Sequence, residues 1–143
     1  MEEKKYTISV LTEDKPGLLN QITIIFNRRK INVESLNVSS SEVKGVSRYT
    51  IVVRLTETEV EKIVKQIRKV VDVLGSFYYE EDDIYTREIA LYKLSSKVYE
   101  NNDELKQLIK DHDARIIAME DDQVVIEKTG SKMETHELYD ALE

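Results

Sequence analysis

The chain has 143 residues and a net charge of −7, with no cysteine, no tryptophan, one proline and four glycines. Its 41% hydrophobic and 34% charged residues are typical of a globular protein, and its length allows one ordinary domain or two small ones. The negative charge argues against a nucleic-acid partner, which needs clustered Lys and Arg, and the lack of cysteine excludes disulfides and thiolate zinc ligands.

The first six residues are too charged for a signal peptide. The longest apolar runs are much shorter than the roughly 20 residues that a membrane-spanning helix needs. We therefore expect a soluble, cytoplasmic protein with no membrane partner.

The first half of the chain alternates strand and helix patterns. Apolar residues at helical spacing predict a first helix over residues 18–29. Thr58 and Glu61 have the spacing of a capping box, which predicts the start of a second helix. The predicted strands cover residues 6–11, 33–40, 46–55 and 73–79. The order strand, helix, strand, strand, helix, strand is that of a split βαβ, or ferredoxin-like, unit.

An acidic segment, residues 80–83, then predicts a linker, after which the pattern restarts. Asn101 and Ser131 are predicted to cap two helices, the second with a capping box to Glu134. The predicted strands cover residues 84–94, 114–119 and 124–128. We therefore predict an α+β protein of two tandem ferredoxin-like units, residues 1–80 and 84–143, the second lacking its last strand.

Evidence for an enzyme is weak. His112 and His136 lie in polar stretches outside any known catalytic motif, and surface positions are the simpler interpretation for both. The four glycines are far apart, so no phosphate-binding loop is present. The strand at residues 47–53 lacks the paired aromatics of RNA-recognition modules. We predict no catalytic residue and no metal site, although an enzyme with unrecognised carboxylate chemistry remains an alternative.

The loop before the first predicted helix is the most informative segment. Pro16 and Gly17 place the N–H groups of residues 17–19 at a helix N-terminus, where a carboxylate can bind. Asp14 could hold an ammonium group, and Asn32 can donate and accept hydrogen bonds. Together these groups suit an amino acid. An ordinary Pro-Gly turn capped by Asp14 fits the same spacing equally well.

These residues also resemble a known family. The segments 14–18 and 28–38 resemble an ACT domain, and more narrowly the small regulatory subunit of acetolactate synthase. Further similar segments follow in order along nearly the whole chain, at residues 47–51, 69–74 and 87–91. A Pro-Gly-Leu loop alone is a weak signal, whereas this ordered series is strong.

The resemblance implies a non-catalytic subunit that activates a large catalytic subunit and confers feedback inhibition, chiefly by valine, on branched-chain amino acid biosynthesis. Thiamine diphosphate, Mg²⁺ and FAD are expected only in the catalytic subunit, and no cofactor is expected in this chain. The family's ACT domains pair, so a homodimer or larger assembly is expected. A free-standing amino-acid sensor that regulates a different enzyme is the alternative.

The family's effector-binding positions correspond to Asp14, Gly17, Leu18 and Asn32. Two departures accompany the resemblance. The family usually has asparagine where this chain has Asp14, which bears on the choice of branched-chain effector. The family also usually carries a further C-terminal segment containing Arg-Ser-Gly, which would supply the last strand of the second unit.

Overall fold

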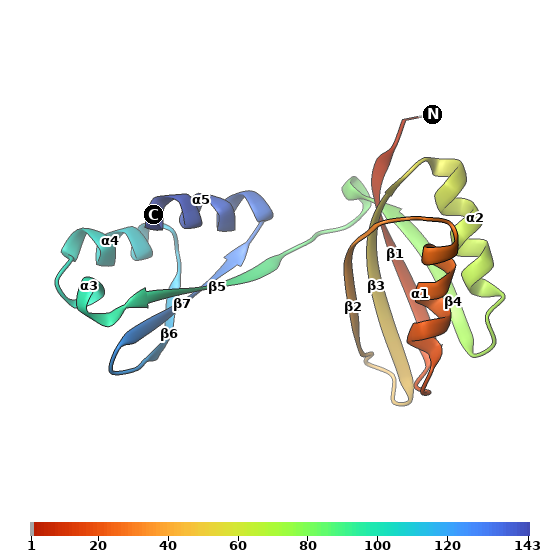
Figure 1. Cartoon of the computed structure of the whole chain (residues 1–143), viewed down its shortest axis with the longest axis horizontal. Helices are drawn as coiled ribbons and strands as arrows, with labels where there is room; N and C mark the ends of the chain where they lie inside the picture. Colours follow the sequence, from red (N-terminus) through yellow and green to blue (C-terminus); the bar gives the residue numbers. More distant parts are fainter. Residues whose placement is uncertain (1) are drawn as a thin grey trace. The chain divides into compact units, whose positions relative to one another are not determined.

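A computed structural model describes residues 2–143, which divide into two compact units, the first running to Tyr85 and the second covering Thr86–Glu143. Figure 1 shows the elements of each unit along the chain. None of the helices formed by residues 2–143 is long and apolar enough to cross a membrane.

The first unit contains a four-stranded antiparallel sheet in the order β2-β3-β1-β4. Its elements are β1 (Lys4–Glu13), α1 (Leu18–Arg28), β2 (Val33–Ser40), β3 (Val46–Leu55), α2 (Glu57–Arg68) and β4 (Val73–Glu80). This is the split βαβ order predicted from the sequence, and the prediction is confirmed. The strand β2 lies at one edge of the sheet and pairs only with β3.

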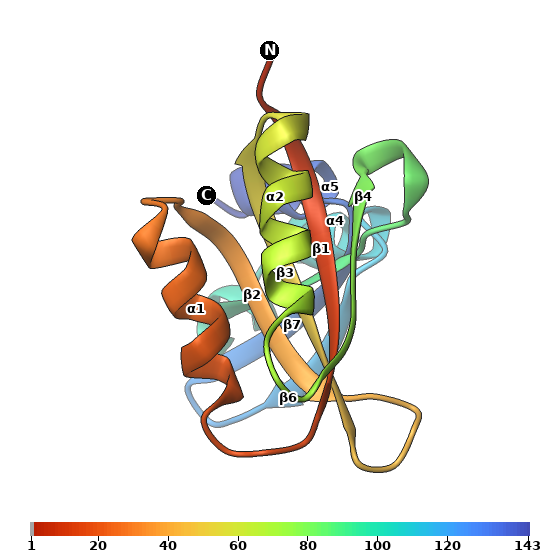
Figure 2. The same cartoon turned by 90° about the vertical axis from the view of Figure 1, so that its right-hand side faces the viewer.

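One face of this sheet carries the core. Along β1 and β3 every second residue is buried, as expected for strands with one covered face. Both helices lie over that face, in front of the sheet in Figure 2. Their buried residues recur at helical spacing, and they are Leu18, Ile22, Ile25 and Phe26 in α1 and Val60, Ile63, Val64 and Ile67 in α2. Burial of these side chains fixes the direction in which each helix crosses the sheet.

The start of α2 differs from the prediction. The capping residue is Thr56, whose side chain accepts a hydrogen bond from the Glu59 N–H while the Glu59 carboxylate accepts one from the Thr56 N–H. The predicted pair, Thr58 and Glu61, has the same spacing two residues later. The earlier pair caps the helix because β3 ends at Leu55 and the chain turns directly into α2.

The second unit contains a three-stranded antiparallel sheet in the order β5-β7-β6. Its elements are β5 (Glu88–Ser95), α3 (Ser96–Glu100), α4 (Asp103–Asp111), β6 (Arg115–Met119), β7 (Gln123–Gly130) and α5 (Lys132–Leu142). Within residues 86–143 no fourth strand pairs with β5, so β5 is an edge strand, as predicted. The strand begins at Glu88, four residues later than predicted. The segment before it starts with a short 3-10 helix, Glu81–Asp83, and continues without regular structure.

The helical segment after β5 also differs from the prediction. A single helix capped by Asn101 was expected, but two short helices form. The cap of α4 is Asn102, whose side chain accepts a hydrogen bond from the Leu105 N–H at 3.1 Å. The side chain of Asn101, which directly follows α3, instead donates to the Lys97 carbonyl within that helix. By contrast, the predicted capping box of Ser131 with Glu134 at the start of α5 is confirmed.

The core of the second unit is small. Its buried cluster consists of Ile109, Val124 and Ile126. Lys128 is also nearly buried, and its ammonium group donates to the His112 carbonyl at the end of α4, at 2.5 Å. That carbonyl lies at the negative end of the helix dipole, so a buried cation is stabilised there.

We predict that Thr56→Ala lowers the free energy of unfolding of the first unit by about 1 kcal/mol, because α2 then begins without its side-chain cap. Urea denaturation followed by circular dichroism measures the change. The control is Thr56→Ser, which retains the capping hydroxyl and should keep most of the stability. Equal losses in both variants would contradict a capping role for the hydroxyl.

We also predict faster amide exchange across residues 84–143 than across residues 6–79. The second unit has the smaller buried cluster and a sheet of three strands rather than four, so its local opening costs less free energy. Hydrogen–deuterium exchange of the full chain, read by mass spectrometry, measures this difference. Equal protection of the two ranges would show that the second unit is stable without a neighbour for β5.

Candidate functional site

The first turn of α1 is open to a ligand. Gly17 precedes the helix with φ 86°, a left-handed conformation that glycine adopts without steric cost, and no side chain caps the helix. A Cβ at this position would meet no atom within 4 Å, so the conformation, rather than crowding, favours glycine. The first turn also contains no acidic residue. Its free N–H groups therefore suit an anion.

The loop that precedes α1 is held from two sides. The Glu13 N–H donates to the Asp72 carbonyl at 2.9 Å, and the Asp14 N–H donates to the Gly45 carbonyl at 3.0 Å. The Lys15 ammonium bridges the carboxylates of Glu13 and Asp72 at 3.0 and 3.2 Å, and hydrogen bonds to both raise the pKa of Lys15. The loop thus has a defined conformation, and the exposed Asp14 carboxylate remains available to a ligand.

Three of the four predicted effector residues lie together at this end of α1. Asp14 and Gly17 are exposed, whereas Leu18 is 2% exposed. The Leu18 side chain belongs to the interior, so only its backbone N–H can serve a ligand in this loop.

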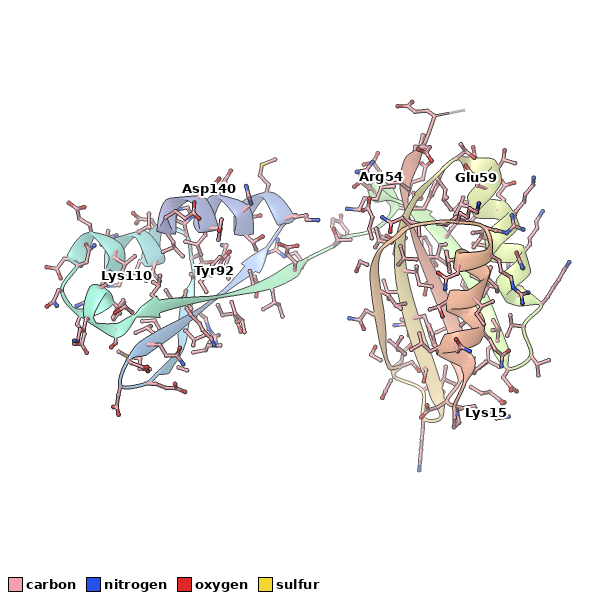
Figure 3. All side chains as sticks on the ribbon, in the orientation of Figure 1. Lys15, Arg54, Glu59, Tyr92, Lys110 and Asp140 are labelled. Carbon is pink, nitrogen blue, oxygen red and sulfur yellow. The ribbon has the colours of Figure 1, made fainter. Side chains whose placement is uncertain are left out.

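Asn32 lies at the opposite end of α1. The helix has 11 residues and so measures about 16 Å. Asn32 lines a shallow hollow of about 310 Å³ together with Arg54 and Glu59. Figure 3 labels the latter two residues at the end of the unit opposite Lys15. A single chain therefore does not bring Asn32 to the other three residues.

Apolar side chains are exposed along the free edge of the sheet. Leu36 and Val38 of β2 are 41% and 43% exposed, and Leu19 in the first turn of α1 is 44% exposed. In register with β3, Leu36 and Val38 face the same side of the sheet as the buried Ile51 and Tyr49. The core face of the sheet thus continues onto an uncovered edge, which is the arrangement of a surface that binds another chain.

Tyr49 of β3 also lies toward this end of the unit, and the sequence analysis did not name it. It pairs with Val10 in β1 and is 4% exposed. Burial raises the pKa of the Tyr49 hydroxyl, and the negative charge of Asp14 raises it further. The alternation of β3 predicts a core side chain here, and the structure places one.

The alternative sites considered in the sequence gain no support. Residues 2–143 contain no group of three or more His, Asp or Glu side chains arranged to hold a metal ion. His136 is exposed and lies 3.5 Å from Asp140, one turn along α5. His112 ends α4, where its carbonyl accepts the Lys128 hydrogen bond.

Comparison with known proteins matches both units to families of acetolactate synthase small subunits. A family described as the AHAS small subunit-like ACT domain matches residues 8–75, and one described as the small subunit of acetolactate synthase matches residues 87–143. An acetolactate synthase small subunit of Mycobacterium bovis is 34% identical over 143 residues, covering 100% of this chain and 84% of the relative.

More distant relatives agree. A probable acetolactate synthase small subunit of Methanothermobacter thermautotrophicus is 32% identical, over 91% of this chain and 77% of the relative. The crystal structure of the acetolactate synthase small subunit of Thermotoga maritima superposes with a TM-score of 0.84 and 28% identity. It covers 96% of this chain and 86% of that one.

Proposed function

The chain belongs to the family of acetolactate synthase small subunits, and we propose that it activates a large catalytic subunit and makes that subunit sensitive to valine. The observation that carries the proposal is the match along the whole chain: two family descriptions cover the two units in order, and a full-length relative has 34% identity. Small-subunit identity implies a partner subunit, since the name describes one component of an assembly.

In this proposal the chain contributes no chemistry of its own. The catalytic subunit holds thiamine diphosphate, Mg²⁺ and FAD, and it condenses pyruvate with pyruvate or 2-oxobutyrate in the cytoplasm. This chain binds a branched-chain amino acid and changes the activity of its partner. A regulatory subunit must associate with another chain, and the exposed apolar side chains at the β2 edge suit such an association.

The effector site is proposed to form between two copies of the chain. When the β2 edges of two copies pair antiparallel about a two-fold axis, their α1 helices also run antiparallel, because α1 lies on the β2 side of the sheet (Figure 2). The N-terminal end of one α1 then meets the C-terminal end of the other. Gly17 of one chain comes near Asn32 of the partner subunit, which explains why one chain alone separates them.

The site fits the chemistry of a branched-chain amino acid. The effector's carboxylate binds the free N–H groups at the start of α1, and Asp14 binds its ammonium group. The exposed side chains of Leu19 and Val38 provide an apolar surface for the branched side chain. The same pairing covers these apolar groups, so dimer formation and effector binding use one interface.

We predict that the purified chain forms no acetolactate and that it raises the turnover of the catalytic subunit when the two are mixed. The reason is that the proposal places all cofactors in the catalytic subunit. A colorimetric acetolactate assay across a titration of the chain, with and without valine, measures both effects. Product formed by the chain alone would contradict a purely regulatory role.

We predict that Gly17→Asp abolishes valine binding, because a second carboxylate at the start of α1 repels the carboxylate of the ligand. Calorimetry on the full chain measures the affinity. Gly17→Asn is the matched control: it has nearly the same size and tolerates the left-handed conformation, so it should bind valine more tightly than Gly17→Asp. Unchanged binding by Gly17→Asp would place the effector elsewhere.

The shared site is tested by mixing two inactive variants. Gly17→Asp and Asn32→Ala each impair both sites of their homodimers, but a mixed dimer has one site in which Gly17 and Asn32 are both native. Mixed dimers should therefore recover valine binding at about one site per dimer. No recovery in confirmed mixed dimers would contradict a site shared between two chains.

A further inference from the structure

Lys30, just beyond the end of α1, has a backbone conformation that lysine rarely adopts. Its φ is 57°, in the left-handed region, where a Cβ crowds the following carbonyl and glycine is the usual residue. Two hydrogen bonds close the helix there. The Lys30 N–H donates to the Asn27 carbonyl at 3.1 Å, and the Ile31 N–H donates to the Phe26 carbonyl at 3.0 Å. A lysine at this position therefore strains the backbone in a way that glycine would not.

Lys30 also lines the hollow of about 310 Å³ at the C-terminal end of α1. Two other cations line this hollow, and both are engaged. The Arg29 guanidinium donates to the Gln66 side chain at 2.9 Å, and Arg54 forms an ion pair with Glu34 at 3.0 Å. Lys30 is exposed, and its ammonium group has no hydrogen bond or ion pair with any of residues 2–143. Lys30 therefore provides a free positive charge in the hollow.

The carboxylates of the hollow do not cancel this charge by contact. They belong to Glu3, Glu34 and Glu59. Glu34 is paired with Arg54, and Glu59 accepts the capping hydrogen bonds at the start of α2. The exposed Glu3 carboxylate makes no bond to Lys30. The hollow thus offers one free cation and one free carboxylate, and an anionic group that enters it meets its partner at Lys30.

The hollow is shared with Asn32, the predicted effector residue that one chain keeps away from Gly17. In the pairing proposed above, the C-terminal end of one α1 meets the N-terminal end of the other. Because Lys30 and Asn32 line one hollow, a pairing that brings Asn32 of the partner subunit to the effector also brings Lys30 of the partner subunit. The free N–H groups at the start of α1 then face a cation across the interface, and an anion between them is attracted by both.

We propose that Lys30 of the partner subunit binds the carboxylate of the effector, which the N–H groups at the start of α1 hold from the other side. This assignment rests on the proposed function. A carboxylate has two oxygens and accepts hydrogen bonds from both sets of donors at once, and a bond from an ammonium group is among the stronger ones. Backbone strain that serves no contact within one chain is then explained by a contact to the ligand.

The test compares Lys30→Gly with Lys30→Arg in the full chain by calorimetry with valine and by thermal unfolding. Lys30→Gly removes the cation and relieves the strain. We therefore expect valine affinity to fall about tenfold, the size of one hydrogen bond between charged groups, while the unfolding midpoint rises by about 3 °C. Lys30→Arg keeps the positive charge, so its affinity should stay within about threefold of native. A lysine with only a structural role would not lose affinity as stability rises.

Asp113 provides a matched control. It has the same position after α4 in the second unit, with φ 54°. The Asp113 N–H donates to the Lys110 carbonyl and the Ala114 N–H to the Ile109 carbonyl, both at 3.0 Å. Asp113→Gly relieves the same kind of strain outside the unit that holds the proposed effector site. It should not lower the unfolding midpoint, and valine affinity should be unchanged.

The outcomes separate this assignment from the proposed function. Valine affinity of Lys30→Gly within twofold of native overturns the assignment and leaves the proposed function standing. An equal loss of affinity in Asp113→Gly, or a Lys30→Gly chain that binds weakly because light scattering shows it to have dissociated, overturns the assignment as well. Failure of the native chain to bind any branched-chain amino acid overturns the proposed function, and this assignment with it.

Discussion

The first unit depends on the burial of one sheet face beneath α1 and α2. Alternate side chains of β1 and β3 and the apolar faces of both helices form this core, and most of its members are less than 5% exposed. Because α1 must place Ile22 and Phe26 against the sheet, it runs back across the core face from the end of the sheet at which β1 stops. The helix therefore starts beside Gly17 at one end of the sheet and delivers Asn32 to the other. Core packing thus sets the distance between Gly17 and Asn32, the two parts of the proposed effector site.

The same packing explains why the edge strand β2 of the first unit keeps exposed apolar side chains. The helices cover the centre of the sheet but leave Leu36 and Val38 of β2 substantially exposed. The edge strand also has unpaired backbone groups along one side. A second chain that pairs with β2 satisfies those backbone groups and covers the apolar side chains in a single step. The second unit has an open edge as well, at β5, where Ile89 and Leu91 are exposed, but its core is much smaller.

Many of the helices and strands could be predicted from the sequence, because their patterns depend only on residues that are close together in the chain. The alternation of β1, the apolar stripe of α1 and the capping box at Ser131 each depend on neighbours within a few residues. The prediction from sequence was wrong where two neighbouring capping boxes could each start the same helix. Thr56 and Thr58 are each followed three residues later by glutamate, and only the end of β3 decides between them. That Asp14, Gly17, Leu18 and Asn32 bind an effector stays a prediction, and α1 separates Asn32 from the other three within one chain.

The anchored loop before α1 has a thermodynamic consequence. Residues 13–15 are already tied to the turn at Gly45 and to Asp72 by two backbone hydrogen bonds and the ion pairs of Lys15. A ligand that enters such a loop does not have to order it, so little conformational entropy is lost on binding. These bonds join the loop before α1 to the turn between β2 and β3 and to the segment that precedes β4. If the proposed effector binds there, its effect on a partner chain therefore does not depend on the folding of a flexible segment.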